Sequence, residues 1–218
     1  MKEYRKIPNI FLWNAKYNCI LGYNETAEVL KNIQWIGTEK IDGTNVRIYW
    51  DGHTITWAGH TEKTTLPANL NQYLQDKFGT KEMEYVFEQL FEDKEAYLFG
   101  EGYGYKIQKD GEKYVDGQDC GFILFEVQID GWDLSRENVD DIAHNIDVPS
   151  VPVVFEGTLG EAQEFVAAHH MSTLGDGSHE MEGLVLEPAK IQLYDKRGHM
   201  IKFKCKYQDL VKGGKISK

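Results

Sequence analysis

The chain has 218 residues, of which 41% are hydrophobic and 27% are charged, and its formal net charge is −11 at pH 7. This composition is that of a soluble globular protein, and no apolar run approaches the roughly 20 residues that span a bilayer. The first residues lead into only a short apolar patch, so we expect no secretory signal and a cytoplasmic protein. The acidic balance argues against non-specific coating of DNA, although an enzyme that acts on nucleic acid needs only a local basic surface.

The length allows one substantial core, and we find no repeat and no Pro/Gly/Ser-rich linker, so we expect a single domain. The three cysteines, Cys19, Cys120 and Cys205, lie far apart without the spacing of a zinc site. We therefore expect ordinary thiols and no disulfide framework.

The predicted elements begin with a β-hairpin directly after Lys40. Residues 44–50 alternate between apolar and polar side chains, and Asp51-Gly52 supplies a turn into a second strand over residues 53–57. Residues 68–91 have helical spacing that is interrupted at Gly79, which predicts two helices.

The second half of the chain predicts a further helix and several short strands. Thr158 to Glu161 has the spacing of a capping box, and we expect the helix that follows to end at residues 175–177. Short strands are predicted at residues 97–101, 121–127, 182–187 and 199–204. Together these elements indicate an α+β fold.

Lys40 is the candidate nucleophile. It opens Lys40-Ile41-Asp42-Gly43 between two strand-like segments. A lysine amine attacks phosphorus only when unprotonated, so it needs burial or neighbouring cations that lower its pKa. Gly43 could supply a tight turn that lets a phosphate approach the backbone.

Two other segments carry charges suited to phosphate chemistry. Lys202 and Lys204 alternate with apolar residues, so they should project together and clamp a phosphate; alternatively, they belong to an amphipathic surface strand. Glu182 precedes Gly183 and a short apolar strand, which would fix a hard oxygen ligand for Mg²⁺; alternatively, it is a solvated glutamate at a strand end.

Five segments in order resemble the motifs of the covalent nucleotidyltransferases, which are ATP- or NAD-dependent DNA ligases, RNA ligases and mRNA capping enzymes. The segments are Thr38-Glu39-Lys40-Ile41-Asp42-Gly43-Thr44-Asn45, Phe99-Gly100-Glu101-Gly102-Tyr103-Gly104, Phe122-Ile123-Leu124-Phe125-Glu126-Val127, Glu182-Gly183-Leu184-Val185-Leu186 and Ile201-Lys202-Phe203-Lys204-Cys205-Lys206. The first segment is most similar to the RNA ligase 2 branch of ATP-dependent RNA ligases. The resemblance implies an α+β nucleotidyltransferase domain, ATP-grasp-like, with antiparallel sheets flanked by helices. We expect this single adenylylation domain to occupy residues 1–218 without a separate C-terminal domain, in whose place a protein partner could act.

The resemblance also implies roles for individual residues. Lys40 would take AMP in covalent linkage, and Mg²⁺ or Mn²⁺ would bind at Glu182 and Glu101. The remaining roles in binding ATP are adenine-edge recognition by Glu39, a phosphate contact by Asn45, ribose binding by Glu101, adenine stacking by Phe125, phosphate binding by Lys202 and Lys204, and a cationic role for His60 where relatives have arginine. Without the resemblance, Asn45 reads as a turn residue, Phe125 as core, and Glu39 and His60 as exposed side chains.

The predicted activity is ATP-dependent joining of RNA 3′-hydroxyl and 5′-phosphate ends. A DNA ligase or a GTP-using capping-type transferase is the alternative within enzymes, and a non-catalytic module that binds nucleotides or RNA ends is the alternative outside them. Residues 196–218 hold eight basic residues and one acidic residue. We expect this end either to contact RNA or to be a solvated tail.

Overall fold

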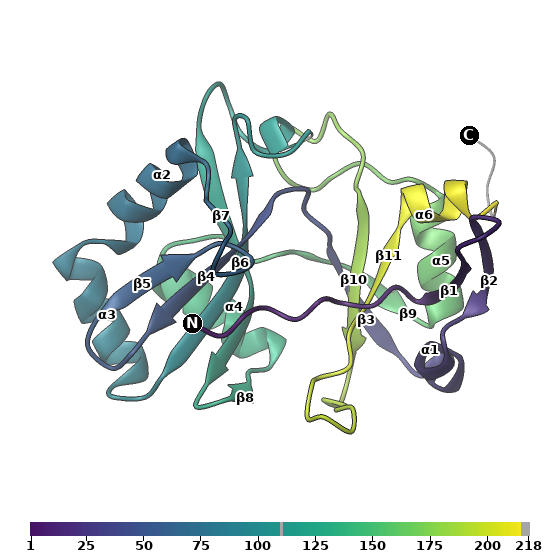
Figure 1. Ribbon diagram of the computed structural model, residues 1–218, viewed down its shortest axis with the longest axis horizontal. Coiled ribbons are helices and arrows are strands. Elements are labelled where there is room, and N and C mark those ends of the chain that lie inside the picture. The colour runs from purple at the N-terminus through teal and green to yellow at the C-terminus, as the bar shows by residue number, and fades with distance from the viewer. Residues whose placement is uncertain (110, 215–218) are drawn as a thin grey trace. The chain divides into compact units, whose positions relative to one another are not determined.

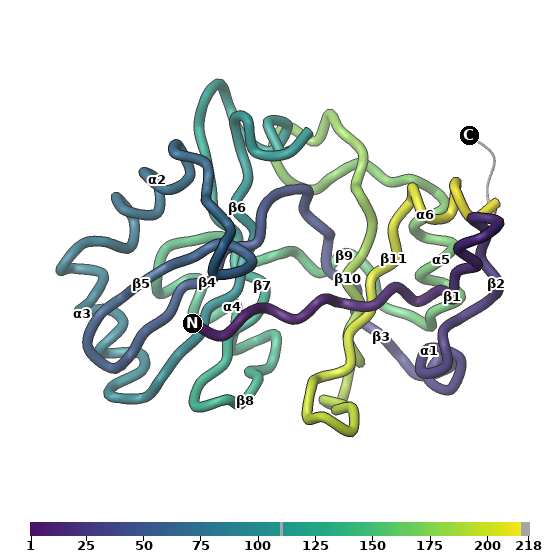
Figure 2. The backbone as a smooth tube through the Cα atoms, in the orientation of Figure 1, coloured from purple at the N-terminus to yellow at the C-terminus, as the bar shows by residue number. Residues whose placement is uncertain are grey.

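The computed structural model describes residues 1–109 and 111–214, in which the contacts form two compact units. Unit 1 comprises Met1–Arg5 and Ile41–Val151, and unit 2 comprises Lys6–Lys40 and the chain from Pro152 onward. Figures 1 and 2 show the course of the chain through these elements. Lys215 and Lys218, at the end of the predicted basic tail, lie outside the described residues.

Unit 1 is built on a five-stranded antiparallel sheet of order β5-β4-β6-β7-β8. Its strands are β4 (Thr44–Trp50), β5 (Ile55–Ala58), β6 (Ala96–Gly104), β7 (Cys120–Ile129) and β8 (Trp132–Asp133). Its helices are α2 (Ala68–Phe78), α3 (Lys81–Phe91), α4 (Arg136–Asn145) and the short 3-10 helix η1 (Gly111–Tyr114). The buried side chains of α2, α3 and α4 join one core with those of the sheet, which leaves the opposite face for other groups.

Unit 2 contains a four-stranded antiparallel sheet of order β11-β10-β3-β9 and a two-stranded hairpin, β1-β2. The strands are β1 (Phe11–Asn14), β2 (Cys19–Tyr23), β3 (Trp35–Glu39), β9 (Val153–Gly157), β10 (Gly183–Pro188) and β11 (Phe203–Lys206). The helices are α1 (Glu25–Leu30), α5 (Leu159–Ala167) and α6 (Tyr207–Lys212). Side chains from these helices share a core with alternate residues of β3, β10 and β11.

The structure confirms the predicted α+β class with antiparallel sheets and flanking helices. It also confirms the hairpin after Lys40, in which Asp51 accepts backbone hydrogen bonds from His53 and Thr54 at 2.9 and 2.7 Å. The two helices on either side of Gly79 are present, and Thr158 caps α5 with the predicted capping box.

Two predicted boundaries are wrong. Helix α5 ends at Ala167 rather than at residues 175–177, because His169 adopts a left-handed backbone conformation with φ 56° that turns the chain away. The predicted strand over residues 199–204 is shifted, since β11 starts at Phe203 and the N–H of Ile201 donates to Leu193 O at 2.6 Å. None of the helices in the described ranges has the length and apolar character needed to cross a bilayer.

Candidate active site

Lys40 lies in unit 2, at the end of β3. Its backbone N–H donates to Gly183 O at 2.9 Å, which continues the ladder between β3 and β10 by one residue. Its Nζ lies 2.5 Å from Oε2 of Glu182, and Nζ of Lys206 lies 2.6 Å from Oε1 of the same carboxylate. One glutamate therefore holds two ammonium groups.

The close approach of β10 and β11 explains how Glu182 meets Lys206. Gly183 pairs with Lys206 across the sheet, and a Cβ on Gly183 would lie 2.1 Å from Cys205 O. Only glycine fits against the neighbouring backbone at this distance. Glu182, the residue before it, is thereby fixed beside the end of β11.

Positive charge dominates the electrostatics around Glu182. Burial lowers the pKa of Lys204, and the cations Lys206 and Lys40 lower it further. Burial alone would raise the pKa of Glu182, but the two lysines that contact it bring the pKa below its ordinary value. Lys40 and Lys206 contact the Glu182 carboxylate, and Lys204 lies close enough to both lysines to feel their charge, so these cations are suited to a phosphate chain. We call Lys40, Lys204, Lys206 and Glu182 the lysine cluster.

Lys202 lies on the same side of the sheet as Lys204, as the alternation predicts, but it contacts a different carboxylate from Lys40 and Lys206. Lys202 precedes β11, is 5% exposed, and forms an ion pair with Glu187 at 3.1 Å. The lysines grouped with Lys40 are Lys204 and Lys206. Lys206 belongs to the last motif but was not predicted as a site residue, although one more step of the same alternation would have included it. A phosphate-binding role for Lys202 stays a prediction.

Glu39 points to the other side of the sheet from Lys40. Successive strand residues face opposite sides, and Glu39 shares its side with the core residues Trp35 and Leu184. Its carboxylate, on a residue 1% exposed, accepts hydrogen bonds from the hydroxyl of Ser172 and from the N–H and hydroxyl of Thr173 at 3.0 and 2.8 Å. The side chain thus ties the loop after α5 to β3, and its predicted contact with adenine stays a prediction.

Asn45 and Glu101 are brought together in unit 1. The two residues pair directly across β4 and β6, and Asn45 is the second residue of β4. The Oδ1 atom of Asn45 is buried and has no hydrogen-bond partner in the part of the chain that the structure describes. Buried carbonyl oxygens are rarely left unpaired, so this atom is suited to accept a hydrogen bond from a ligand.

Gly43 also lies in unit 1, and its predicted role beside a phosphate stays a prediction. A Cβ at this position would lie 2.3 Å from Gly102 O and 2.7 Å from Cγ of Glu101. The backbone that comes close to Gly43 is therefore that of β6. The glycine lets the segment after Lys40 pack against the strand that carries Glu101.

Phe125, the predicted adenine-stacking residue, is half-buried at an irregularity of β7. Its ring centroid lies 5.1 Å from that of Tyr4, which also packs against Phe99 at 4.9 Å. The Tyr4 hydroxyl donates to Glu126 at 3.0 Å. No local sequence pattern marks Tyr4, because the contact joins residues about 120 positions apart. The predicted role of Phe125 itself is not tested by these contacts.

Arg47 is a second residue of unit 1 that sequence reasoning missed. It is fully buried, and its guanidinium donates to the backbone oxygens of Gly59, Met1 and Lys2 at 2.6, 3.0 and 2.8 Å. Arg47 thus anchors the first residues of the chain to β4. His60, which follows Gly59, is exposed and makes no hydrogen bond or ion pair within residues 1–109 and 111–214; its cationic role stays a prediction.

The predicted metal ligands are one carboxylate in each unit, and their role stays a prediction. No group of three or more His, Cys, Asp or Glu side chains in the described ranges could hold a metal by itself. Mg²⁺ commonly uses one or two carboxylates and completes its shell with water and phosphate oxygens. Glu182 offers such a carboxylate in unit 2, and Glu101 offers one in unit 1.

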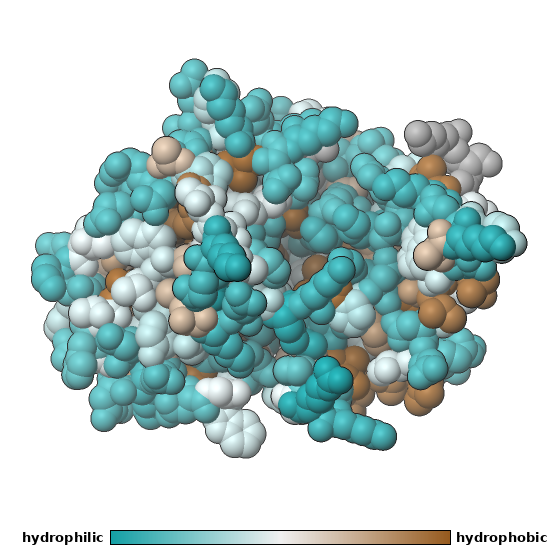
Figure 3. Space-filling model, in the orientation of Figure 1, coloured by the Kyte–Doolittle hydropathy of each residue, from teal (hydrophilic) through white to brown (hydrophobic). Residues whose placement is uncertain are grey.

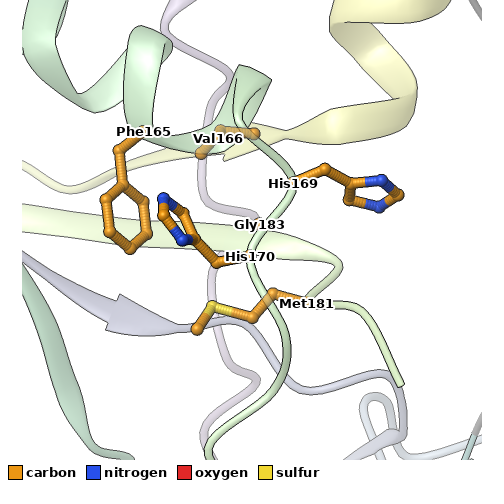
Figure 4. Close-up of a pocket in the computed structure, with 6 residues that line it drawn as sticks. All are labelled: Phe165, Val166, His169, His170, Met181 and Gly183. Carbon is orange, nitrogen blue, oxygen red and sulfur yellow. The ribbon is translucent and has the colours of Figure 1, made fainter. Parts of the chain in front are cut away.

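A small hollow in unit 2 lies next to Glu182. It is lined by Phe165, Val166, His169, His170, Met181 and Gly183 (Figure 4). The His170 ring stacks on Phe165 with centroids 4.2 Å apart, and His169 stacks on Tyr207 at 3.4 Å. The apolar and aromatic side chains that line this hollow lie beside the strand end that carries Glu182.

Comparison with known proteins identifies the family of this chain. The family model described as RNA ligase matches residues 33–204. A search of curated protein sequences found no match.

Solved structures of an RNA ligase from Naegleria gruberi share the fold. The form with pyrophosphate superposes with a TM-score of 0.65 at 18% identity, covering 99% of this chain and 58% of that one. A mutant with AMP and manganese gives a TM-score of 0.65 at 17% identity, with coverages of 95% and 56%. A mutant with ATP and manganese gives 0.60 at 20% identity, with coverages of 84% and 52%. The chain thus spans somewhat more than half the length of these relatives.

Proposed function

The chain belongs to the RNA ligase family, and on that premise we propose that it is an ATP-dependent RNA ligase that works through a lysyl-AMP intermediate. The observation that carries the proposal is the lysine cluster. Lys40 stands at the end of a strand with two further lysines and one carboxylate around it. A binding module does not require a lysine at this position, whereas covalent nucleotide transfer does.

In the proposed first step, the unprotonated Nζ of Lys40 attacks the α-phosphorus of ATP. The nitrogen–phosphorus bond forms as the bond between the α-phosphorus and the bridging oxygen breaks, and pyrophosphate leaves with the electron pair. Lys204 and Lys206 offset the charge on the phosphates. A bound Mg²⁺ would neutralise phosphate charge during this transfer.

The proposed second and third steps transfer AMP to RNA and then join the ends. A 5′-phosphate oxygen displaces Lys40 from the adenylyl phosphorus, and a 3′-hydroxyl then attacks the activated 5′-phosphorus and releases AMP. The use of ATP and a divalent metal is supported by the Naegleria gruberi relatives, whose structures contain ATP and manganese. The proposed contribution of Asn45 is supported by its buried oxygen without a partner; those of Glu101 and Phe125 rest on the motif resemblance.

The decisive experiment is intact-protein mass spectrometry after incubation with ATP and Mg²⁺, with Lys40→Ala as the matched variant. We expect one added adenylyl group on the wild type and none on the variant. An adduct on Lys40→Ala would reject Lys40 as the nucleophile. No adduct on wild-type protein that is free of AMP at the start would reject ATP-dependent transfer.

The acceptor and the nucleotide are tested separately. We expect ATP, and not GTP, to give the adduct, and the adenylylated protein to seal RNA ends in preference to DNA ends. An adduct with GTP alone would favour a capping-type transferase. Sealing of DNA in preference to RNA would favour a DNA ligase.

A further inference from the structure

The loop between β10 and β11 in unit 2 is a basic hairpin. It runs from Lys190 to His199 and extends from the ends of the two strands (Figure 1). Every residue in this range except the half-buried Leu193 is exposed. The proposed function does not use any residue of this hairpin.

The turn of the basic hairpin is shaped by its own backbone. The Asp195 carboxylate accepts hydrogen bonds from the N–H groups of Arg197 and His199 at 2.8 and 2.9 Å. Gly198 N donates to Asp195 O at 3.0 Å and has φ +78°, a conformation that favours glycine. The side chains of Lys196 and Arg197 take no part in these bonds. The turn therefore displays two cations without needing them for its shape.

The cations of the basic hairpin lie close together on one exposed loop. Lys190, Lys196 and Arg197 form no ion pair within the described residues. Some exposed lysines elsewhere pair with acids, as Lys81 does with Glu84 and Lys94 does with Glu92 at 3.3 Å, whereas Lys63 and Lys109 form no ion pair within the described residues. In a protein of net charge −11, three unpaired cations on one protruding loop make a local positive surface.

Two apolar side chains accompany these charges. Tyr194 is 41% exposed and Ile191 is 59% exposed, both on the same hairpin. The tip of this loop is covered by strongly hydrophilic side chains (Figure 3). Cations combined with an exposed aromatic ring are the features that bind single-stranded nucleic acid, through its phosphates and through base stacking.

The hairpin lies at the far end of β10 from the lysine cluster. From Glu182 to Pro188 the strand advances six residues, which corresponds to about 20 Å at about 3.4 Å per residue. A stacked strand with a rise of about 3.4 Å per nucleotide covers this distance in about six nucleotides. An RNA end at the cluster could therefore reach the hairpin with its seventh or a later nucleotide.

We propose that the basic hairpin binds the backbone of the RNA substrate about six nucleotides from the end that is joined. Lys190, Lys196 and Arg197 contact phosphates, and Tyr194 stacks on a base. This inference rests on the proposed function for the identity of the ligand. It predicts that the hairpin matters for long RNA strands and not for short ones.

The test measures binding of full-length protein to 5′-phosphorylated, fluorescently labelled RNA by anisotropy at several salt concentrations. The variant is Lys196→Ala/Arg197→Ala, and the matched control is Lys63→Ala/Lys109→Ala, which removes two exposed lysines of unit 1 that form no ion pair in the described part of the chain. The two RNA molecules are about 12 and about 4 nucleotides long. The first is longer, and the second shorter, than the roughly six nucleotides that separate the lysine cluster from the hairpin.

For the longer RNA, log K should fall less steeply with log salt in the hairpin variant than in the wild type. The slope should become less negative by about 1.4, since each lost phosphate contact on a single strand removes about 0.7. The control should keep the wild-type slope, and neither variant should change binding of the shorter RNA. Tyr194→Ala should weaken binding of the longer RNA by about fivefold or more.

Equal slopes for the hairpin variant, the control and the wild type would overturn the proposal, as would equal losses on both RNA lengths. Formation of lysyl-AMP with ATP alone is measured in parallel and should be the same in all of these proteins. A wild type that forms no adduct would reject the proposed function, while the anisotropy series would still judge the hairpin.

Discussion

Nζ of Lys40 and Oε2 of Glu182 are 2.5 Å apart, so the candidate nucleophile is held by a carboxylate. The Nζ that would attack phosphorus is thus engaged in an ion pair. Lys206 contacts the same carboxylate. We infer that an arriving nucleotide must reorganise this pair before Lys40 can react.

Glu182→Gln should slow formation of lysyl-AMP by at least about tenfold, equivalent to about 1.4 kcal/mol in the barrier. The substitution removes the only carboxylate of the lysine cluster and a candidate metal ligand while it keeps the shape of the side chain. The measurement is the rate of adduct formation by mass spectrometry. Glu187→Gln is the control, because Glu187 pairs with Lys202 outside the cluster. An equal effect of both substitutions would contradict the assignment.

The same carboxylate predicts how stability depends on acid. Two lysines hold the pKa of Glu182 below its ordinary value of 4.5, so the unfolded chain binds this proton more readily than the folded one. The stabilisation is present above pH 4.5 and is lost as the pH falls through the lowered pKa. Urea denaturation between neutral pH and about pH 3.5 should show a smaller loss for Glu182→Gln than for the wild type. Identical pH profiles would show that Glu182 does not contribute.

Ser172→Ala should destabilise the protein by about 1.5–3 kcal/mol, the range for a hydrogen bond to a charged group. Ser172 donates to the buried carboxylate of Glu39, which has no access to water that could replace the lost donor. Thr173→Val should cost less, because the N–H of Thr173 still donates to Glu39. Urea unfolding measures both values. Wild-type stability in Ser172→Ala would reject the role of this contact.

Gly43→Ala should destabilise unit 1 and reduce adduct formation. The new methyl group would meet the Gly102 carbonyl at 2.3 Å, and backbone atoms cannot move aside as a flexible side chain can. We expect a cost of about 1–3 kcal/mol, as for other overpacking substitutions. Gly160→Ala in α5 is the control, since its nearest neighbours lie 4.0 Å away and alanine favours the helix. The measurement is thermal denaturation of both variants. A melting temperature of Gly43→Ala equal to that of the wild type would contradict the assignment.

Tyr4→Ala should raise the KM for ATP in adduct formation by several fold, if Phe125 stacks on adenine as proposed. Removal of the Tyr4 ring takes away the aromatic ring that contacts both Phe125 and Phe99. Tyr4→Phe keeps the ring and loses only the hydrogen bond to Glu126, so its KM should stay close to that of the wild type. A loss of stability without a change in KM would assign Tyr4 to packing alone.

Local patterns in the sequence predicted the parts of the fold that local chemistry determines. The alternation of residues 44–50 with Asp51-Gly52 predicted the β4-β5 hairpin, and the capping box predicted the start of α5. The end of α5 was missed because it depends on one left-handed residue, His169, which no composition rule marks.

The site was predictable only in part, for a similar reason. Motif order identified Lys40 and Glu182, which are in direct contact. The same reasoning selected Lys202 and Lys204 and left out Lys206, because alternation fixes the side of a strand but not which positions along it lie beside the nucleophile. The contact of Glu39 with Ser172 joins residues 133 positions apart, so only the folded chain reveals it.

Strand β3, which directly precedes Lys40, is synthesised long before the strands with which it pairs. β3 is complete at Glu39, but its partners β9 and β10 start at Val153 and Gly183. The sheet of unit 1 is made from one continuous stretch of chain, whereas the sheet of unit 2 closes a loop of more than 100 residues. Such long closures are slow. On a ribosome, unit 1 can therefore form its sheet while Lys40 still lacks the strand that brings Glu182.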